Sequence, residues 1–524
     1  MGVSGFTPTA GECKLEKKTP GELRRPRLAV SAASNWAALA VNVVVTLLLT
    51  PYLISKLGKE GFGIWSLVWS LVGYYGLLRM GVGSGIMRYL PFYEGRGDYR
   101  AASEVVSTGL AIFCCVGLVI FLSASFLAWP IANFYKGGAI LATLVILTGL
   151  SAALDCPKMI FDAGLRAQEK WIVANSLGIT NSLVHGVGLA GVLYLGYGLV
   201  QMGYVVLAEI VFSLVLITVI FIILSKKIDL KPSMVKRGRI RELVSFGILT
   251  TIVTLGYSLS LQTHRLIIGK IISFEAVGVY AVAASLVERV RSFVWAPLQV
   301  SWPRFALLDG QGNRQELNNL FIRMTRYSAF LSSGVILIIL VSGPPFIALW
   351  VGEGFEAAQK VLLILGVGCL IETSLVITTS LLGSTGHQGA QAIFAAAEGT
   401  LGITLSILMG RTMGLSGVVI GYTVAVILIR GFVCPRYVCR LLNISVAKYY
   451  KNCLVRPWII MGVLAGLGHG LGLMGYITNW FSWIVFTVVA SCAYSITTWV
   501  FALNLKEKAE ILGIIKPYVP RWCF

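Results

Sequence analysis

The chain has 524 residues, of which 56% are hydrophobic and only 13% are charged, and its mean hydropathy is +0.81. A soluble protein of this size could not bury so much apolar surface, so the composition excludes an ordinary soluble enzyme or binding domain. An all-α integral membrane protein that crosses the bilayer many times is the class that this composition predicts.

The first 27 residues are polar and basic, and no apolar run precedes a cleavage site, so 1–27 is predicted to be a cytoplasmic arm. Apolar runs of about 20 residues, long enough to cross a bilayer, follow. An N-lobe (28–225) is predicted to hold six of them: Leu28–Ile54, Phe62–Leu78, Val105–Ala128, Ala139–Leu154, Ile172–Leu195 and Val200–Leu224. A basic linker (226–242) then leads to a C-lobe (243–440) with six more: Leu243–Ile268, Ala276–Leu298, Ala329–Trp350, Val361–Leu382, Ala390–Met409 and Gly414–Val433.

An interfacial segment around Asn443 to Asn452 and a final helix pair complete the membrane part (441–505). The two last spans are Trp458–Leu473 and Trp480–Ala502, and a cytoplasmic tail (506–524) ends the sequence. The sequence therefore predicts fourteen transmembrane helices, arranged as two six-helix lobes and a C-terminal pair.

The distribution of basic residues predicts the orientation. The lysines and arginines that fall in the alternate, outward loops are few: Lys56, Lys59, Lys136, Lys270, Lys360 and Arg411. Short loops rich in Lys and Arg stay in the cytoplasm, so both termini are predicted to be cytoplasmic in a multi-pass protein of the inner cell membrane. The net charge of +20 therefore belongs mostly to the cytoplasmic face, where it favours anionic lipid head groups and does not imply nucleic acid.

Two stretches about 215 residues apart match each other weakly. The first contains Lys56, Glu60, Gly63, Trp65, Ser70, Leu71, Gly95, Gly97 and Asp98, and the second contains Lys270, Glu275, Gly278, Tyr280, Ser285, Leu286, Gly310, Gly312 and Asn313. A same-direction repeat in an apolar chain is typical of transporters whose two halves rock around a central site. The repeat therefore predicts that the two lobes are structurally related.

Several ionisable residues fall inside the spans, where a charge at mid-bilayer costs roughly 2.5–3.5 kcal/mol. They are Glu209 and His185 in the N-lobe, and Arg265, Glu288, Arg289, Arg291, Glu372 and Glu398 in the C-lobe. Glu288 and Arg291 share a helix face and could pair locally, whereas Arg289 needs another partner, such as Glu372 or Glu398. Two interpretations stay open: the charges neutralise one another between helices, or the arginines line a wet cavity while the acids act in pairing or coupling. For Glu209 and His185 the structural interpretation is favoured.

A polar stripe follows one face of the seventh span. It consists of Thr251, Thr254, Ser258, Gln262 and Arg265, spaced three or four residues apart. Such a stripe suits the wall of a cavity, and it equally suits hydrogen bonding between membrane helices. The first span carries a looser counterpart that includes Asn42.

Motifs of soluble enzymes are absent from the sequence. No Walker loop, zinc-binding spacing or nucleophile elbow occurs, and the ten cysteines show no metal-binding framework. The chain is therefore expected not to be an enzyme and to hold no metal or cofactor. Any active transport must then draw on an ion gradient (H⁺ or Na⁺), the membrane potential or removal of the product.

Several short motifs resemble those of a known family. They are Leu49–Ile54, which leads into Leu57–Trp65, then Met80–Gly85 with Arg88 and Tyr89, and Arg265–Lys270, which leads to Val279 and Tyr280. In these motifs the chain resembles the polysaccharide transporters of the MOP superfamily, the Wzx-type flippases of lipid-linked oligosaccharides. The resemblance implies two six-helix lobes around a central cavity that opens alternately to either side. The extra C-terminal pair is similar to that of the peptidoglycan-precursor flippases, where it forms a groove for the lipid tail, although many polysaccharide exporters also have fourteen spans.

The resemblance implies that the chain moves an undecaprenyl-pyrophosphate-linked oligosaccharide to the outer leaflet for cell-surface polysaccharide synthesis. Membrane lipids, and a polymerase or glycosyltransferase complex, are the other partners it suggests. The guanidinium group matches phosphate geometry, so cavity arginines suit this substrate. The expected contacts are Arg265, Arg289 and Arg291 for the pyrophosphate, Arg88 for its first attraction, and Asn42, Ser258 and Gln262 for the sugars.

Two alternatives stay open. A multidrug exporter of the same superfamily would exchange cations for cationic drugs through N-lobe carboxylates, of which only Glu209 lies inside a span here. A membrane scaffold of an envelope-assembly complex would transport nothing, and its charges would be purely structural.

Overall fold

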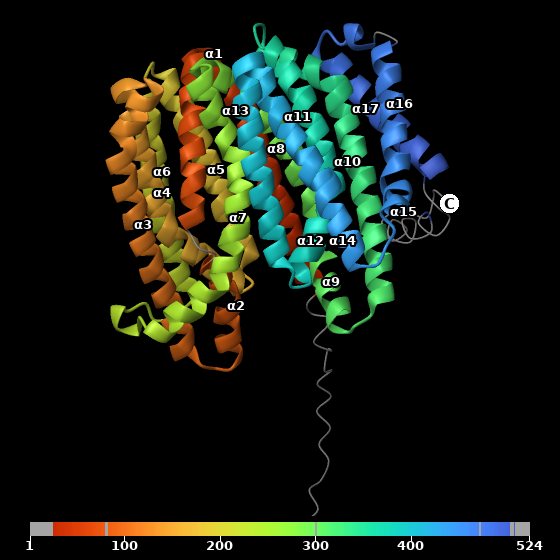
Figure 1. Cartoon of the computed structure of the whole chain (residues 1–524). Helices are drawn as coiled ribbons and strands as arrows, with labels where there is room; N and C mark the ends of the chain where they lie inside the picture. The colour runs from red at the N-terminus through yellow and green to blue at the C-terminus, as the bar shows by residue number, and fades with distance from the viewer. Residues whose placement is uncertain (1–24, 79–81, 299–300, 471–472, 503–507, 509–524) are drawn as a thin grey trace, which may run out of the picture.

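The described part of the protein is a bundle of long helices (Figure 1). The computed structural model describes residues 25–78, 82–298, 301–470, 473–502 and residue 508, and no β-strand occurs in these ranges. The predicted arm 1–27, apart from its last three residues, and the predicted tail 506–524, apart from residue 508, lie outside the described residues.

The first half of the chain forms α1 (Arg25–Leu78), α2 (Val82–Gly95), α3 (Tyr99–Tyr135), α4 (Gly138–Ala167), α5 (Trp171–Tyr194), α6 (Leu199–Leu224) and the short turn η1 (Pro232–Met234). The second half forms α7 (Arg237–Ile271), α8 (Phe274–Leu298), α9 (Ser301–Gly310), α10 (Arg314–Val351), α11 (Glu356–Ser374), α12 (Val376–Ser384), α13 (Gln388–Val426), η2 (Ile427–Val433) and α14 (Cys434–Leu441). The C-terminal part consists of α15 (Val446–Tyr450), η3 (Lys451–Val455), α16 (Arg456–Gly470), η4 (Leu473–Tyr476), α17 (Trp480–Thr497) and η5 (Thr498–Ala502).

Ten of the described helices are long and apolar enough to cross a membrane, which confirms a multi-pass membrane protein. Two of the ten bend sharply, at Gly58 (φ 68°) and at Gly414 (φ 61°). These backbone conformations are left-handed, so they favour glycine and interrupt the helix. Each bend lies where two predicted spans meet.

The predicted interfacial stretch differs from the structure. Residues from Val446 onward are helical and continue into α16, so the helix begins well before the predicted Trp458. The reason is packing, because Tyr449, Cys453 and Leu454 are buried. The ring of Tyr449 stacks on Phe321 of α10 at 5.3 Å between centroids.

Equivalent capped turns begin α3 and α10, where the two copies of the repeat end. The Oδ1 atom of Asp98 accepts the Ala101 amide at 2.9 Å, and the Oδ1 atom of Asn313 accepts the Glu316 amide at 3.1 Å. Gly97 and Gly312 precede these residues with φ of 73° and 67°. Since the side-chain oxygen satisfies a free amide of the first helical turn, each residue stabilises the start of its helix. The two matching stretches thus end in capped turns of the same geometry.

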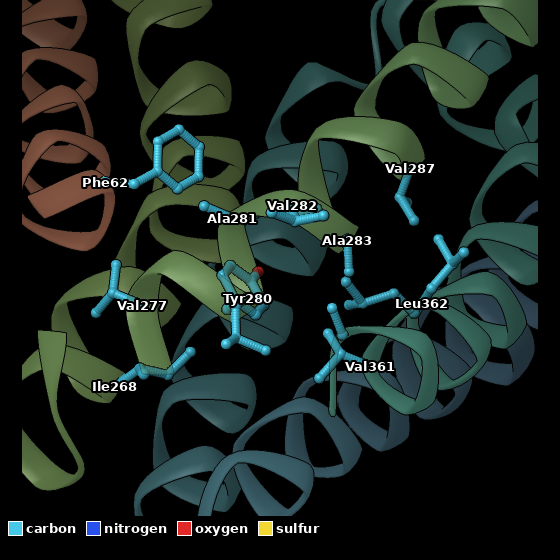
Figure 2. Close-up of a cluster of buried hydrophobic side chains, with 14 of the residues drawn as sticks. Phe62, Ile268, Val277, Tyr280, Ala281, Val282, Ala283, Val287, Val361 and Leu362 are labelled. Atoms are coloured by element: carbon cyan, nitrogen blue, oxygen red, sulfur yellow. The ribbon is translucent and has the colours of Figure 1, made fainter. Parts of the chain in front are cut away.

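The buried apolar side chains form one core that joins the two halves of the chain, one core within the second half, and one core of the first half that also includes Leu243 of α7. The shared core combines α1 residues such as Phe62 and Trp65 with residues of α8 and α11. Figure 2 shows Phe62 facing the Val277–Val287 region of α8, with Val361 and Leu362 beyond it.

A second core contains only residues after Val290, and a third contains only residues from Val72 to Leu243. The second and third cores include residues of α9 and of α2, which lie at the lower end of the bundle in Figure 1. The core shared by α1, α8 and α11 thus lies toward the end that carries the Gly58 bend, and toward the other end the third core packs Leu243 of α7 against the first half.

The two halves approach each other closely at a reciprocal helix crossing. A Cβ atom added to Gly63 of α1 would overlap the main-chain carbonyl oxygen of Phe274, and one added to Gly278 of α8 would overlap that of Lys59. Gly63 and Gly278 are equivalent in the repeat, as are Lys59 and Phe274, so the contact is the same in both directions. Glycine is required at both positions because any side chain would push the two backbones apart.

Candidate functional site

Two adjoining cavities of about 550 and 420 Å³ lie between helices of the two halves. They are lined by α1, α4, α5 and α6 on one side and by α7 and α8 on the other. Both cavities share five lining residues: Trp69, Asn181, His185, Glu209 and Arg265. These residues mark a common centre, rich in polar side chains, in the middle of the helical bundle.

Arg265 of α7 faces this centre and is held by neighbouring polar groups. Its guanidinium donates to the Glu288 carboxylate at 3.2 Å and to the Gln262 amide oxygen at 3.3 Å. The Arg265 side chain is 12% exposed, whereas that of Glu288 is 43% exposed. The predicted local pair of Glu288 with Arg291 is therefore wrong, because Glu288 reaches across to α7 instead.

Arg289 of α8 lines the smaller cavity and has only neutral partners. It donates to Oδ1 of Asn42 at 2.9 Å and to Oγ1 of Thr46 at 3.1 Å, both on α1. No carboxylate of the described residues lies within ion-pair distance of it. The predicted pairing of Arg289 with Glu372 or Glu398 is wrong, because its side chain points toward the first half of the chain.

The remaining ionisable groups at the cavity walls carry partners. Nδ1 of His185 lies 2.5 Å from Oε2 of Glu209, and Lys158 lies 3.2 Å from Asp155. Together with the Arg265–Glu288 pair, these contacts leave Arg289 as the cavity arginine that no carboxylate neutralises, among the residues that the structure describes. Arg289 therefore places at the α8 wall of the cavity a fixed positive charge that no described carboxylate contacts.

Aromatic rings cover part of the same wall. Trp69 of α1 contacts the His185 ring edge-on at 6.3 Å between centroids, and Trp65 contacts Trp69 in the same way at 6.0 Å. Trp69 is 37% exposed. An exposed indole beside polar groups offers the apolar face and the hydrogen-bonding surroundings that a sugar ring requires.

Arg291 does not line either of the two large cavities. Its guanidinium lies 2.9 Å from the Glu372 carboxylate, beside a void of only about 20 Å³. Arg430 lies 2.8 Å from the same carboxylate and 2.5 Å from that of Glu398. These four residues, Arg291, Glu372, Arg430 and Glu398, form a charge cluster that joins α8, α11, α13 and η2 within the second half of the chain.

The sequence prediction missed Arg430, which it assigned to the basic inner face. The residue lies in the π-helical segment η2, just before Pro435. Pro435 has no N–H to donate to the Gly431 carbonyl, and this carbonyl accepts the Tyr450 hydroxyl instead. Pro435 follows Arg430 by about one helical turn, near the end of the predicted span. This spacing was the feature of the sequence that could have indicated an irregular helix at Arg430.

The other predicted site residues lie in several places. Gln262 lines the larger cavity and Asn42 the smaller one. Arg88 is exposed on α2, where it lies over the Tyr89 ring at 5.5 Å, and lines neither cavity. The backbone of Thr251, Thr254 and Ser258 is helical, but these residues lie outside those whose side chains the structure describes.

Residues 57–360 match the model of a family described as polysaccharide biosynthesis protein. The chain belongs to this family. It is 20% identical over 495 residues to the Bacillus subtilis (strain 168) membrane protein EpsK, covering 93% of this chain and 97% of that one. It is also 23% identical over 409 residues to a Shigella flexneri protein named as an O-antigen transporter, covering 75% and 94% of the two chains. Neither relative is named as an enzyme.

Solved structures of transporters share the fold. A multidrug resistance MATE family transporter of the MOP superfamily, in its inward-facing conformation, matches with a TM-score of 0.68 at 16% identity, over 77% of this chain and 99% of that one. The lipid II flippase MurJ, in an inward closed conformation, matches with a TM-score of 0.66 at 14% identity, over 90% and 98% of the two chains. The resemblance to MOP-superfamily polysaccharide transporters that the sequence predicted is thus confirmed.

Proposed function

We propose that the protein is a flippase that carries an undecaprenyl-pyrophosphate-linked oligosaccharide from the cytoplasmic to the outer leaflet of the inner membrane. The observation that carries this proposal is Arg289, a guanidinium inside the membrane that lines a cavity and lacks a carboxylate partner among the described residues. A fixed cation in such a place is costly unless an anion visits it. The Shigella relative named as an O-antigen transporter supports the same substrate class.

The proposed topology has fourteen spans. The ten apolar helices include the two that bend at Gly58 and Gly414, each of which would cross twice. The charged helices α7 and α8 would supply the remaining two crossings. With both termini cytoplasmic, the end of the bundle that carries α2 and α9 would face the cytoplasm.

The physics of the head group explains the parts of the cavity. A pyrophosphate–glycan cannot cross hydrocarbon unaided, because each unpaired polar group costs several kilocalories per mole. Arg289 would hold the pyrophosphate, since its planar fork stays charged and donates to phosphate oxygens in pairs. Asn42, Gln262 and Trp69 would contact the sugars. An anion that leaves a negative interior gains roughly 2.3 kcal/mol per charge per 100 mV, so the membrane potential favours export.

Flipping can be measured in vesicles that contain the purified protein and a fluorescent lipid-pyrophosphate oligosaccharide. Wild type should expose the head group to a membrane-impermeant reagent, and Arg289→Ala should lose at least tenfold in rate. Arg411→Ala serves as the matched control, because Arg411 is exposed on α13 and lines neither cavity. Equal flipping by wild type and Arg289→Ala would overturn the proposed role of the cavity. Transport of a cationic drug without head-group flipping would favour the multidrug exporter, and no transport of either would favour a scaffold.

A further inference from the structure

The four glutamates that lie inside the predicted spans fall into two chemical classes. Glu288, Glu372 and Glu398 each lie against arginine, at 3.2, 2.9 and 2.5 Å. Arginine does not release its proton in proteins, so these pairs keep a fixed charge. Glu209 instead lies against His185, a side chain whose charge changes near neutral pH. The His185–Glu209 pair is therefore the one that can change its proton content within this group.

The location of the pair gives it access to water and to the substrate. Both residues line both large cavities, although the Glu209 side chain is only 8% exposed. His185 lies about nine residues from the end of α5, and Glu209 ten residues from the start of α6, so each is roughly 15 Å inside its helix. Since both residues line the cavities, a proton could reach this depth through them.

The charged groups that face the pair come from the helices that line the same cavities. Asp155 and Lys158 of α4 contact each other, and Arg265 of α7 is held by Glu288 of α8. Arg289 of α8 adds one positive charge, and α1 contributes Trp69, which is neutral and touches the His185 ring. The Asp155–Lys158 and Arg265–Glu288 pairs are each neutral. Apart from the His185–Glu209 pair, the described cavity walls therefore have a net charge of +1, which comes from Arg289.

We propose that His185 and Glu209 form a proton-binding site inside the substrate cavity, and that the bound proton strengthens the binding of an anionic head group. With neutral His185 the pair has a net charge of −1, which cancels Arg289, and with protonated His185 it has none, which leaves the cavity positive. Proton and anion binding then favour each other by the same factor, as linkage requires. This inference rests on the proposed function for the identity of the anion, and on the geometry alone for the proton.

The size of the effect follows from Coulomb's law. Two unit charges about 10 Å apart, a separation suited to cavities of this size, interact at an effective dielectric constant of about 20 strongly enough to change a binding constant roughly tenfold. Anion affinity should therefore fall about tenfold as the pair loses its proton.

The proton site can be tested without any substrate. An imidazolium quenches a neighbouring indole, so tryptophan fluorescence of the full-length protein in lipid nanodiscs should rise between pH 5 and 8. His185→Gln and Trp69→Phe should each abolish this rise, whereas His469→Gln, which removes an exposed histidine on α16, should retain it. A flat wild-type titration, or an unchanged rise in His185→Gln, would overturn the proton site whether or not the protein flips lipids.

The linkage is tested with inorganic pyrophosphate as the probe, by calorimetry on the same nanodiscs. The ratio of wild-type to His185→Gln affinity cancels the titration of pyrophosphate itself. We expect the ratio of wild-type to His185→Gln affinity to fall about tenfold from pH 6 to pH 8. The ratio of wild-type to His469→Gln affinity should stay constant over the same range. A constant ratio for His185→Gln would refute the linkage. If flipping fails in vesicles while the fluorescence titration behaves as expected, the proposed function is wrong and the proton site stands.

Discussion

Removal of Arg430 tests whether the buried charge cluster holds the second half of the protein together. The Arg430 guanidinium is 11% exposed and bridges Glu372 and Glu398, whose side chains are 8% and 1% exposed. Arg430→Met would keep most of the aliphatic volume but leave Glu398 without its ion-pair partner. One oxygen of the Glu398 carboxylate, Oε1, already has no hydrogen-bond partner among the residues that the structure describes.

The expected cost is about 3–5 kcal/mol, which is typical when one partner of a buried ion pair is removed. Glu372 is less affected, because it keeps Arg291 at 2.9 Å. The double variant Arg430→Met/Glu398→Gln should recover a large part of the loss, since its remaining group at position 398 is neutral. The difference between the double variant and the sum of the single variants then measures the coupling between residues 398 and 430.

The assay is reversible unfolding in mixed micelles, followed by tryptophan fluorescence, with Arg411→Met as the exposed control. Arg411→Met should leave the unfolding midpoint unchanged. If Arg430→Met lowered the free energy of unfolding by less than about 1 kcal/mol, the ion pairs of the cluster would contribute little to stability. Mutual neutralisation between helices would then fail to explain why these charges are buried.

Two further predictions concern the repeated elements. Gly63→Ala should force α1 and α8 apart, because its Cβ meets main chain that cannot rotate away. In a cysteine-free background, a cysteine introduced by Ser285→Cys in the cavity should then react faster with an impermeant maleimide added from outside. The control Gly178→Ala, whose Cβ meets nothing within 4 Å, should not change the reaction rate. Asp98→Ala and Asn313→Ala each remove a helix cap of the same geometry. Each should lower the free energy of unfolding by about 1 kcal/mol, and the two losses should add in the double variant. A loss seen in only one variant would show that the two capped turns do not contribute equally.

The sequence predicted the helices well because each apolar run has to cross the same hydrocarbon thickness. Each predicted span overlaps a described helix, but several helices extend further: α4 continues 13 residues past Leu154, α10 begins 15 residues before Ala329, and the helix before Trp458 starts early. That start depends on the contact between Tyr449 and Phe321, which are far apart in the sequence. No local pattern contains such a contact.

The pairing of the intramembrane charges could not be predicted in the same way. Periodicity shows which residues share a helix face, but not which neighbouring helix that face meets. Glu288 and Arg291 do lie on adjacent turns of α8, yet one reaches α7 and the other α11. Arg430 was missed because a basic residue near a helix end is usually a topology signal. His185 and Glu209 were interpreted as structural because the sequence does not show which side of a helix is wet.

The reciprocal crossing of Gly63 and Gly278 has a consequence for how cargo is selected. Main chain meets main chain there, so the contact offers no side chain that could recognise one glycan and refuse another. On the proposed function, relatives could therefore carry a different glycan by altering the residues around Trp69 and Arg289, while the Gly63–Gly278 crossing between the two halves stayed the same. Diversity of surface sugars would then require change only deep inside the protein.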